Sequence, residues 1–152
     1  MNTINKEDLP FDTYHVDHLG LLSSSKKSYR HIFAVVDAFT KFTWLYATKS
    51  TDSAEVIDRL KKQSVVFENS GQIVSDHCSA FTPAAFEDYC KDEKIQHVLI
   101  MTGVPRANGQ VERINRTLIP LLTKLSAAKS EEWYKYLEVA QKFMNATPNT
   151  SN

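Results

Sequence analysis

The stretch YRHIFAVVDAFTKFTWLYAT, residues 29–48, decides the fold class because it contains two strands and a short connection between them. Tyr29–Asp37 and Lys41–Thr48 are rich in aromatic and β-branched residues, a composition typical of strands. Only residues 38–40 separate the two. An extended segment, Tyr14–Leu19, precedes them, so the three together predict an antiparallel meander.

After residue 50 the pattern changes to helices alternating with strands. A first helix is expected from Ser50 and Thr51, with Asp52 and Glu55 at its positive end, an apolar stripe of Ala54, Ile57 and Leu60, and an end at Gly71. The elements expected next are a strand at Gln72–Ser75, a helix capped by Thr82 that begins at Pro83 and buries Phe86, Tyr89 and Cys90, a strand at Ile95–Ile100, and helices at Asn108–Ser126 and Ser130–Asn145.

The resulting order, β-β-β-α-β-α-β-α-α, predicts an α/β domain. Helices flank a five-stranded mixed sheet whose first three strands are antiparallel. A ribonuclease H-like architecture requires this order, although several α/β folds accommodate part of it.

Length and composition predict one globular domain. The chain has 152 residues, of which 42% are hydrophobic and 24% charged, a balance typical of soluble intracellular proteins. No apolar run approaches the ~20 residues of a membrane-spanning helix, and the polar N-terminus is unlike a signal peptide. Two cysteines are too few for a disulfide framework, and the five histidines lack zinc-finger spacing. We therefore expect no membrane association and no structural zinc.

The charge is balanced overall but uneven along the chain. Eighteen basic residues face eighteen acidic ones, whereas a protein that holds nucleic acid by electrostatics alone is normally basic. The segment 106–124 is locally basic, with Arg106, Arg113, Arg116 and Lys124 against the single acid Glu112. Any contact with nucleic acid is expected to use this segment.

Three carboxylates suggest metal-assisted chemistry on phosphodiesters. Asp17 lies inside the first expected strand, Asp76 follows the fourth, and Glu112 lies in the first turns of the next-to-last helix. Thirty-five residues separate Asp76 from Glu112, enough chain to return to the same end of the sheet. Two divalent ions ~3.5–4 Å apart can stabilise both the attacking and the leaving oxygen of a phosphoryl transfer. Mg²⁺ and Mn²⁺ prefer such hard oxygen ligands.

Taken singly, each acid also has a structural interpretation. An Asp at a strand end, such as Asp76 or Asp37, is usually a turn or capping residue. Glu112 alone would usually be a solvated helix acid. Asp17 is the hardest to explain structurally, because a carboxylate inside an apolar strand needs a partner or a metal ion.

The sequence segments around these acids resemble those of a known family. They are HVDHLG (15–20), VVDAFTKFTWLYATKS (35–50), IVSDHCSAFT (73–82) and TGVPRANGQVERINRTL (102–118). They resemble the integrase catalytic cores of retroviruses and, most closely, of Ty3/gypsy-type retrotransposons, members of the DDE polynucleotidyl transferase superfamily. The frame P-x-x-x-G-x-x-E, formed by Pro105, Gly109 and Glu112, is the most specific part. The resemblance places the core at residues 11–147, between an extension (1–10) and a tail (148–152).

The resemblance implies a role for each matching residue. Asp17, Asp76 and Glu112 would be the catalytic, metal-binding triad, with two Mg²⁺ or Mn²⁺ ions when DNA is bound. Residues 102–110 would form a mobile loop with Gly103 and Gly109 as hinges. The DNA contacts would come from Asn108, Gln110, Arg113 and Arg116, although a solvated helix face is an equally good interpretation of the two arginines.

The resemblance also implies partners and context. Family members join element DNA to target DNA in the nucleus, so nuclear and possibly cytoplasmic localisation is expected. They carry a zinc module and a basic module on either side of the core, and neither is found here, so an excised or shortened core is expected. Family cores form homodimers, for which 54–67 and 132–144 are candidate helices, although a plain core role is at least as good an explanation.

Three functional hypotheses remain open from the sequence. The first is an active polynucleotidyl transferase, whose isolated core performs partial reactions such as disintegration, the reversal of strand transfer. The second is a domesticated core that binds nucleic acid or dimerises with little catalysis. The third is a bacterial-type transposase or a true ribonuclease H. The 35-residue interval and the P-x-x-x-G-x-x-E frame argue against a ribonuclease H, and the Ty3/gypsy-like sequence of residues 37–49 argues against a bacterial element.

Overall fold

The computed structural model describes residues 10–19, 29–76, 81–100 and 105–146, without the side chains of 105–112. Its centre is a five-stranded sheet in the order β3-β2-β1-β4-β5. The strands are β1 (Thr13–Leu19), β2 (His31–Asp37), β3 (Thr43–Thr48), β4 (Gln72–Ser75) and β5 (Gln96–Leu99). β1, β2 and β3 pair antiparallel, whereas β1, β4 and β5 pair parallel. The predicted mixed sheet with an antiparallel half is therefore confirmed.

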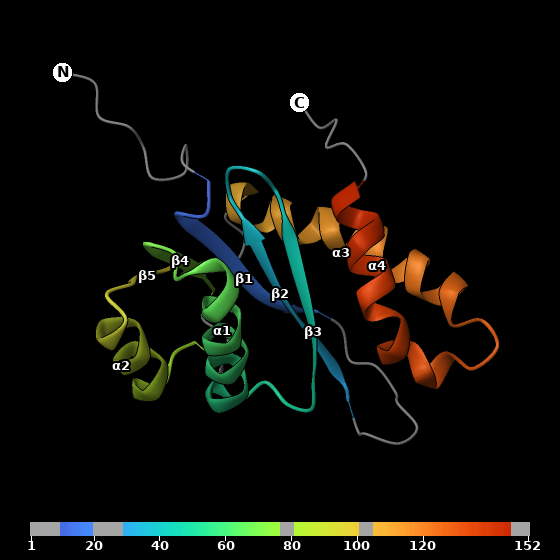
Figure 1. Ribbon diagram of the computed structural model, residues 1–152, viewed down its shortest axis with the longest axis horizontal. Coiled ribbons are helices and arrows are strands. Elements are labelled where there is room, and N and C mark those ends of the chain that lie inside the picture. The colour runs from blue at the N-terminus through green and yellow to red at the C-terminus, as the bar shows by residue number, and fades with distance from the viewer. Residues whose placement is uncertain (1–9, 20–28, 77–80, 101–104, 147–152) are drawn as a thin grey trace.

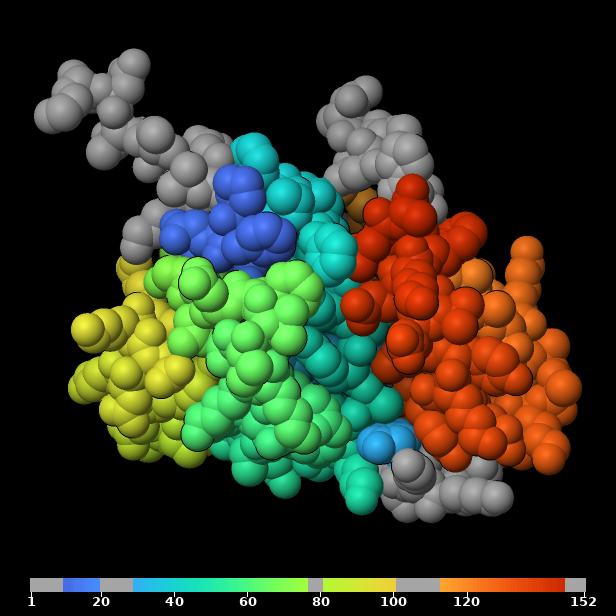
Figure 2. Space-filling model, in the orientation of Figure 1, coloured from blue at the N-terminus to red at the C-terminus, as the bar shows by residue number. Residues whose placement is uncertain are grey.

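Helices cover both faces of this sheet (Figure 1). The first face carries α1 (Ser53–Phe67) and α2 (Ala84–Asp92). The second carries α3 (Pro105–Leu125), a 3₁₀ segment η2 (Ser130–Tyr136) and α4 (Leu137–Ala146). In the space-filling view the two helical layers lie on either side of the strands β2 and β3 (Figure 2). The fold thus has three layers, with one hydrophobic core on each side of the sheet.

The two cores follow from the period-two alternation of side chains along the strands. On β1, Tyr14 and Val16 face α1 and α2, where they pack with Phe33 and Phe86. Leu19 faces the opposite way and packs in a cluster that includes residues of α3 and α4. Asp17 is two residues before Leu19, so the alternation directs it toward the α3 face.

The helix boundaries correct several expectations. The buried stripe of α1 is Val56, Leu60 and Gln63, whereas Ala54 is exposed. α1 ends at Phe67, where Glu68 takes a left-handed φ of 64°, not at Gly71. Gly71 instead lies close to Asp12: an added Cβ would be 2.7 Å from an Asp12 carboxylate oxygen, so the Asp12 side chain would have to move.

The later boundaries differ by a few residues as well. Pro83 is the N-cap of α2 rather than its first helical residue. α3 begins at Pro105 rather than Asn108, which suits the preference of proline for the first turn. The expected last helix is split, because Glu132 has non-helical dihedrals and the chain forms a 3₁₀ segment before α4. The burial of Phe86, Tyr89 and Cys90 on α2 is confirmed.

Side chains cover the free edge of β3. Asn145 on α4 accepts from the Thr43 backbone N–H at 2.8 Å and donates to its carbonyl at 2.8 Å. Gln141 accepts from the Leu45 N–H at 2.9 Å. These bonds satisfy groups that would otherwise offer a pairing edge to another strand.

Candidate active site

Asp17 and Asp76 meet at neighbouring parallel strands. The register pairs Thr13 with Gln72 and His15 with Val74. Continued by two residues, the same register places Asp17 beside Asp76, which directly follows β4. The sequence prediction that these acids reach the same end of the sheet is supported by this geometry.

The two carboxylates influence each other electrostatically. Burial raises the pKa of Asp17, the negative charge of Asp76 raises it further, and the hydrogen bond from the His18 backbone lowers it, with a net rise to about 6. That bond runs from the His18 N–H to Asp17 Oδ1 at 2.7 Å. A half-buried acid beside a second acid is costly to ionise without a nearby cation.

Asp37 shows the contrast with a structural carboxylate. It is fully buried at the end of β2, and its oxygens accept bonds from the Phe11 N–H, the Thr40 N–H and the Thr40 hydroxyl at 2.6–2.9 Å. These bonds close the turn into β3, as expected of an acid at a strand end. Asp17, with one such bond to its carboxylate among the described residues, is not satisfied in this way.

The helix that carries Glu112 lies on the face toward which Asp17 points. α3 packs on β1, and Ile114, two residues after Glu112, is buried in the cluster that contains Leu19. The backbone of Glu112 is in the second turn of α3, while its side chain falls outside the described residues. The three predicted acids therefore come from two neighbouring strands and from a helix on their common face.

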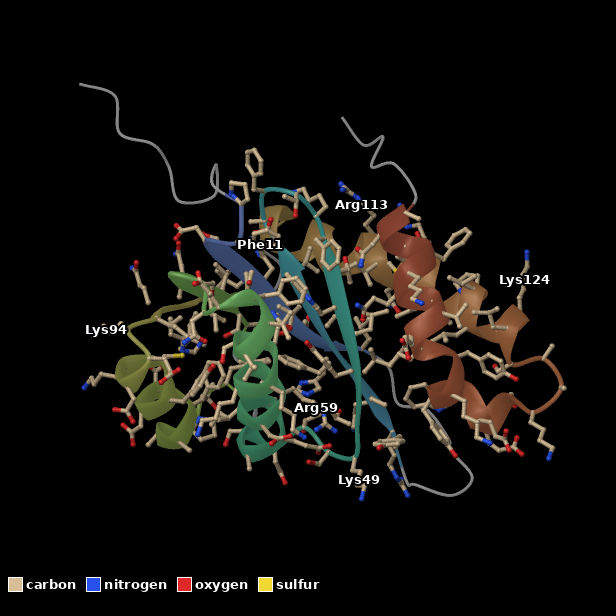
Figure 3. All side chains as sticks on the ribbon, viewed as in Figure 1. Phe11, Lys49, Arg59, Lys94, Arg113 and Lys124 are labelled. Carbon is tan, nitrogen blue, oxygen red and sulfur yellow. The ribbon has the colours of Figure 1, made fainter. Side chains whose placement is uncertain are left out.

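The other predicted site residues lie on or before α3. Arg113 and Arg116 are exposed, and Arg113 projects from α3 at the edge of the molecule (Figure 3). Asn108 and Gln110 are in the helix, with side chains outside the described part. Gly109 is also helical, which corrects the expected loop over residues 102–110: at least from Pro105 onward the chain is α-helix. Gly103 lies outside the described residues.

The residues present suit a hard divalent cation. Asp17 and Asp76 offer carboxylate oxygens, the ligands that Mg²⁺ and Mn²⁺ prefer. Their mutual repulsion is the electrostatic condition that such an ion relieves. Among the side chains that the structure describes, no three His, Cys, Asp or Glu form a metal-binding group, and Glu112 is not among those side chains.

The side chain of His18 lies on the opposite face of β1 from that of Asp17. Its ring stacks on Phe81 and lies near Phe33, with centroid separations of 5.7 and 5.4 Å. Burial lowers the pKa of His18 to about 4, and neighbouring His31 lowers it as well. At neutral pH the ring is therefore uncharged, and it packs among aromatic side chains.

Sequence reasoning missed a hydrogen-bonded chain behind Asp76. Ser75 Oγ lies 2.7 Å from His97 Nε2, and His97 Nδ1 lies 2.5 Å from a carboxylate oxygen of Glu87. The members are 22 and 10 residues apart and come from three elements, so no local motif marks them. The position of Ser75 directly before a candidate ligand was the only available signal.

Comparison with known proteins identifies the family. The mixed sheet with its flanking helices and paired acids defines a domain of ribonuclease H-like architecture. The sequence matches the family described as "Integrase core domain" over residues 7–105, a span that contains Asp17 and Asp76 and ends before Glu112. The chain belongs to this integrase core family.

Relatives include viral and transposon polyproteins. The chain is 35% identical to the Pro-Pol polyprotein of simian foamy virus type 3 over 143 residues, covering 94% of the chain and 12% of the polyprotein. It is 25% identical to the transposon Tf2-3 polyprotein of Schizosaccharomyces pombe over 147 residues, covering 95% of the chain and 11% of that protein. The chain thus spans about an eighth of the length of these relatives.

Solved structures share the fold. The HTLV-2 integrase catalytic core in complex with magnesium, in a trimeric form, has a TM-score of 0.74 at 23% identity, covering 95% of this chain and 90% of that one. A chain of the simian T-cell lymphotropic virus intasome with the PP2A regulatory subunit B56 gamma has a TM-score of 0.82 at 22% identity, covering 99% and 54%. The predicted ribonuclease H-like fold is confirmed. Among the described residues no helix is long and apolar enough to cross a bilayer.

Proposed function

We propose that this domain catalyses metal-dependent DNA strand transfer, processing the 3′ ends of element DNA and joining them to target DNA. One observation carries the proposal: in an integrase core, Asp17 on β1 lies beside Asp76, the residue that directly follows the parallel strand β4, and Asp17 faces the layer that contains the helix of Glu112. Taken with the family, this arrangement favours a nucleotidyl transferase over a module that only binds.

Asp17, Asp76 and Glu112 would hold Mg²⁺ or Mn²⁺, with two ions when DNA is bound. The ions would supply charge stabilisation at the phosphorus and activate the attacking water or hydroxyl. Asp17, on the central strand, has its position fixed by the pairing of β1 with both β2 and β4. Because the pKa of Asp17 is raised, its ionised carboxylate is unfavourable in the metal-free protein, and a bound metal ion would stabilise it at neutral pH.

The DNA contacts would come from α3. Arg113 and Arg116 are exposed on the helix that carries Glu112, and Arg116 is four residues beyond it, on the same helix face. Asn108 and Gln110 would contact the DNA end from the preceding turns. Because the net charge of the chain is zero, we expect weak, salt-sensitive DNA binding by this domain alone.

A homodimer and a nuclear, possibly also cytoplasmic, location remain part of the proposal. Exposed apolar side chains on two helices, Val65 and Val66 on α1 and Val139 and Phe143 on α4, are candidates for the dimer contact. Trp133 and Leu137, by contrast, are buried within the domain. Sedimentation velocity of the wild type and of Val66→Glu would test the α1 contact.

The decisive experiment is disintegration of a branched DNA substrate in Mg²⁺ or Mn²⁺, comparing the wild type with Glu112→Gln. The substitution preserves size and removes the ligand charge. We expect activity in the wild type and a loss of at least about 100-fold in the variant, as for removal of a major electrostatic contribution at a transition state. A folded, DNA-binding wild type without activity in either metal would favour the domesticated binding module instead.

A further inference from the structure

Three side chains from three elements form a continuous hydrogen-bonded chain that ends next to Asp76. Glu87 is on α2, His97 on β5, and Ser75 is the last residue of β4. The imidazole of His97 lies between the other two, 2.5 Å from Glu87 and 2.7 Å from the Ser75 hydroxyl. The Phe86 ring packs against the same imidazole in an edge-to-face arrangement, with a centroid distance of 4.9 Å. The orientation of the imidazole is therefore restrained at both nitrogens and by this aromatic contact.

Burial excludes the most familiar use of a Ser-His-Glu arrangement. Ser75 is 1% exposed and the His97 side chain 2%, whereas Glu87 is 52% exposed on its side-chain atoms. A nucleophilic serine must reach its substrate, and this hydroxyl lies inside the sheet-helix core. The polar chain must instead act on the protein itself.

The nearest functional group on which it can act is the backbone of Asp76. The Ser75 hydroxyl lies 3.2 Å from the Asp76 carbonyl oxygen, and the Ser75 carbonyl accepts from the Ile100 N–H at 2.8 Å. β4 ends at Ser75, and Asp76 follows it directly. The backbone of Ser75 and the bond from its hydroxyl to the Asp76 carbonyl therefore help to set the direction in which Asp76 leaves the sheet.

Firm positioning is needed here because like charges face each other. Asp76 lies beside Asp17 and repels it whenever both are ionised. A strand end held only by backbone pairing can turn to separate the two carboxylates. A buried side-chain network on the opposite face of β4 resists that turn, since any rotation at Ser75 breaks its bond to His97.

We propose that Ser75, His97 and Glu87 are positioning residues that hold Asp76 in the orientation in which it and Asp17 bind a divalent cation together. This role rests on the proposed function, in which the two acids are metal ligands. The Glu87 carboxylate accepts from Nδ1–H of His97, while the Ser75 hydroxyl donates its single proton to the Asp76 carbonyl and contacts Nε2 through its oxygen. Loss of any member should lower metal affinity more than it lowers the rate with metal bound.

The test measures Mn²⁺ binding by calorimetry on the full chain, with disintegration as a second readout. His97→Leu removes both hydrogen bonds and keeps the packing on Phe86. Ser75→Ala removes only one hydroxyl, so it serves as the test if His97→Leu does not fold. His97→Gln restores a partner for Ser75. Ile95→Val is the matched control, because it removes one buried methyl from the same core without touching the chain.

We expect Mn²⁺ affinity to fall about ten-fold in His97→Leu and Ser75→Ala, the lower end of the effect of removing groups that orient metal ligands. His97→Gln should recover part of the loss, and Ile95→Val should stay within about two-fold of the wild type. The disintegration rate at saturating Mn²⁺ should return close to the wild-type rate. In the metal-free protein, a low-field His97 Nδ1–H proton signal should disappear in Glu87→Ala.

The outcomes separate this inference from the proposed function. Wild-type Mn²⁺ affinity in both His97→Leu and Ser75→Ala would overturn the positioning role and leave the metal site intact. Weakened binding in those variants, in a wild type without disintegration activity, would support the positioning role and count against strand transfer. A wild type that binds no Mn²⁺ would overturn both.

Discussion

Asp17→Asn should make the metal-free domain more stable, although it removes a proposed catalytic group. The substitution is nearly isosteric, and the asparagine Oδ1 can still accept the His18 N–H that Asp17 Oδ1 accepts at 2.7 Å. It removes a half-buried negative charge beside Asp76. The uncharged amide therefore ends the repulsion between the two side chains.

The magnitude follows from the pKa of Asp17, which rises from an ordinary 3.8 to about 6 in the folded protein. At ~1.36 kcal/mol per pH unit, this rise corresponds to about 3 kcal/mol, and water at the half-buried site reduces it to about 1–3 kcal/mol. The folded protein holds the proton more tightly than the unfolded chain. Ionisation therefore costs stability: the cost is absent below pH 3.8, grows as the pH rises to 6, and is complete above pH 6.

The assay is urea unfolding in EDTA at pH 7.5 and at the lowest pH at which the wild type stays folded. At pH 7.5 Asp17→Asn should be about 1–3 kcal/mol more stable than the wild type, and the difference should shrink as the pH falls. Mg²⁺ at about 100 times its dissociation constant should stabilise the wild type by about 2.7 kcal/mol and the variant by less.

A matched control and a clear refutation accompany this experiment. Asp88→Asn removes a carboxylate from the exposed face of α2, and we expect it to change stability by less than about 0.5 kcal/mol. Equal stabilities of wild type and Asp17→Asn at pH 7.5 in EDTA would show that the Asp17 charge is solvated and unstrained. The electrostatic account of the site would then be wrong.

Two further predictions concern other parts of the fold. Asn145→Ala should lower the free energy of urea unfolding by about 1–3 kcal/mol and promote self-association, because it leaves the backbone N–H and carbonyl of Thr43 unpaired at the sheet edge. The control Lys142→Ala, at an exposed position, should do neither. Unchanged stability together with a monodisperse Asn145→Ala variant would contradict this prediction. In a Cys78→Ser background, Cys90 should resist iodoacetamide at pH 8 in the native protein, because the thiol is buried and burial raises its pKa to about 12. In guanidinium the same thiol should react within minutes, as followed by mass spectrometry. Comparable rates in both conditions would refute the burial of Cys90.

Much of the fold was predictable because alternation and periodicity report directly on burial. The run 29–48 contains two strands whose short connection forces antiparallel pairing, and the structure pairs them residue by residue. Asp17 could be named as a candidate site residue for the opposite reason, since it violates the apolar pattern of β1; its role stays a prediction. Element order was correct throughout, except that the final helix is divided by the 3₁₀ segment.

The remaining features depend on tertiary contacts that a linear pattern does not contain. In the predicted stripe of α1, Leu60 is buried and Ile57 packs against the core, but Ala54 is exposed. The sequence pattern also missed Gln63, a polar residue that is buried and bonded to the Tyr46 hydroxyl. The end of α1 at Glu68 uses a left-handed non-glycine residue, which sequence rules assign to glycine. The Ser75–His97–Glu87 chain joins residues that no spacing rule connects.

These features together support a candidate site at this end of the sheet. Parallel pairing of β1 with β4 brings Asp17 and Asp76 together at the cost of repulsion, which a lone domain must resist. On one face of β4 the carboxylates face the α3 layer, and on the other the buried His97 holds Ser75 in place. The end of β4 carries both the Asp76 charge and the Ser75–His97 hydrogen bond that restrains it. Weakening this hydrogen bond should therefore lower metal affinity more than it lowers the stability of the fold. Comparing Mn²⁺ affinity with unfolding free energy across the Ser75 and His97 variants separates these two effects.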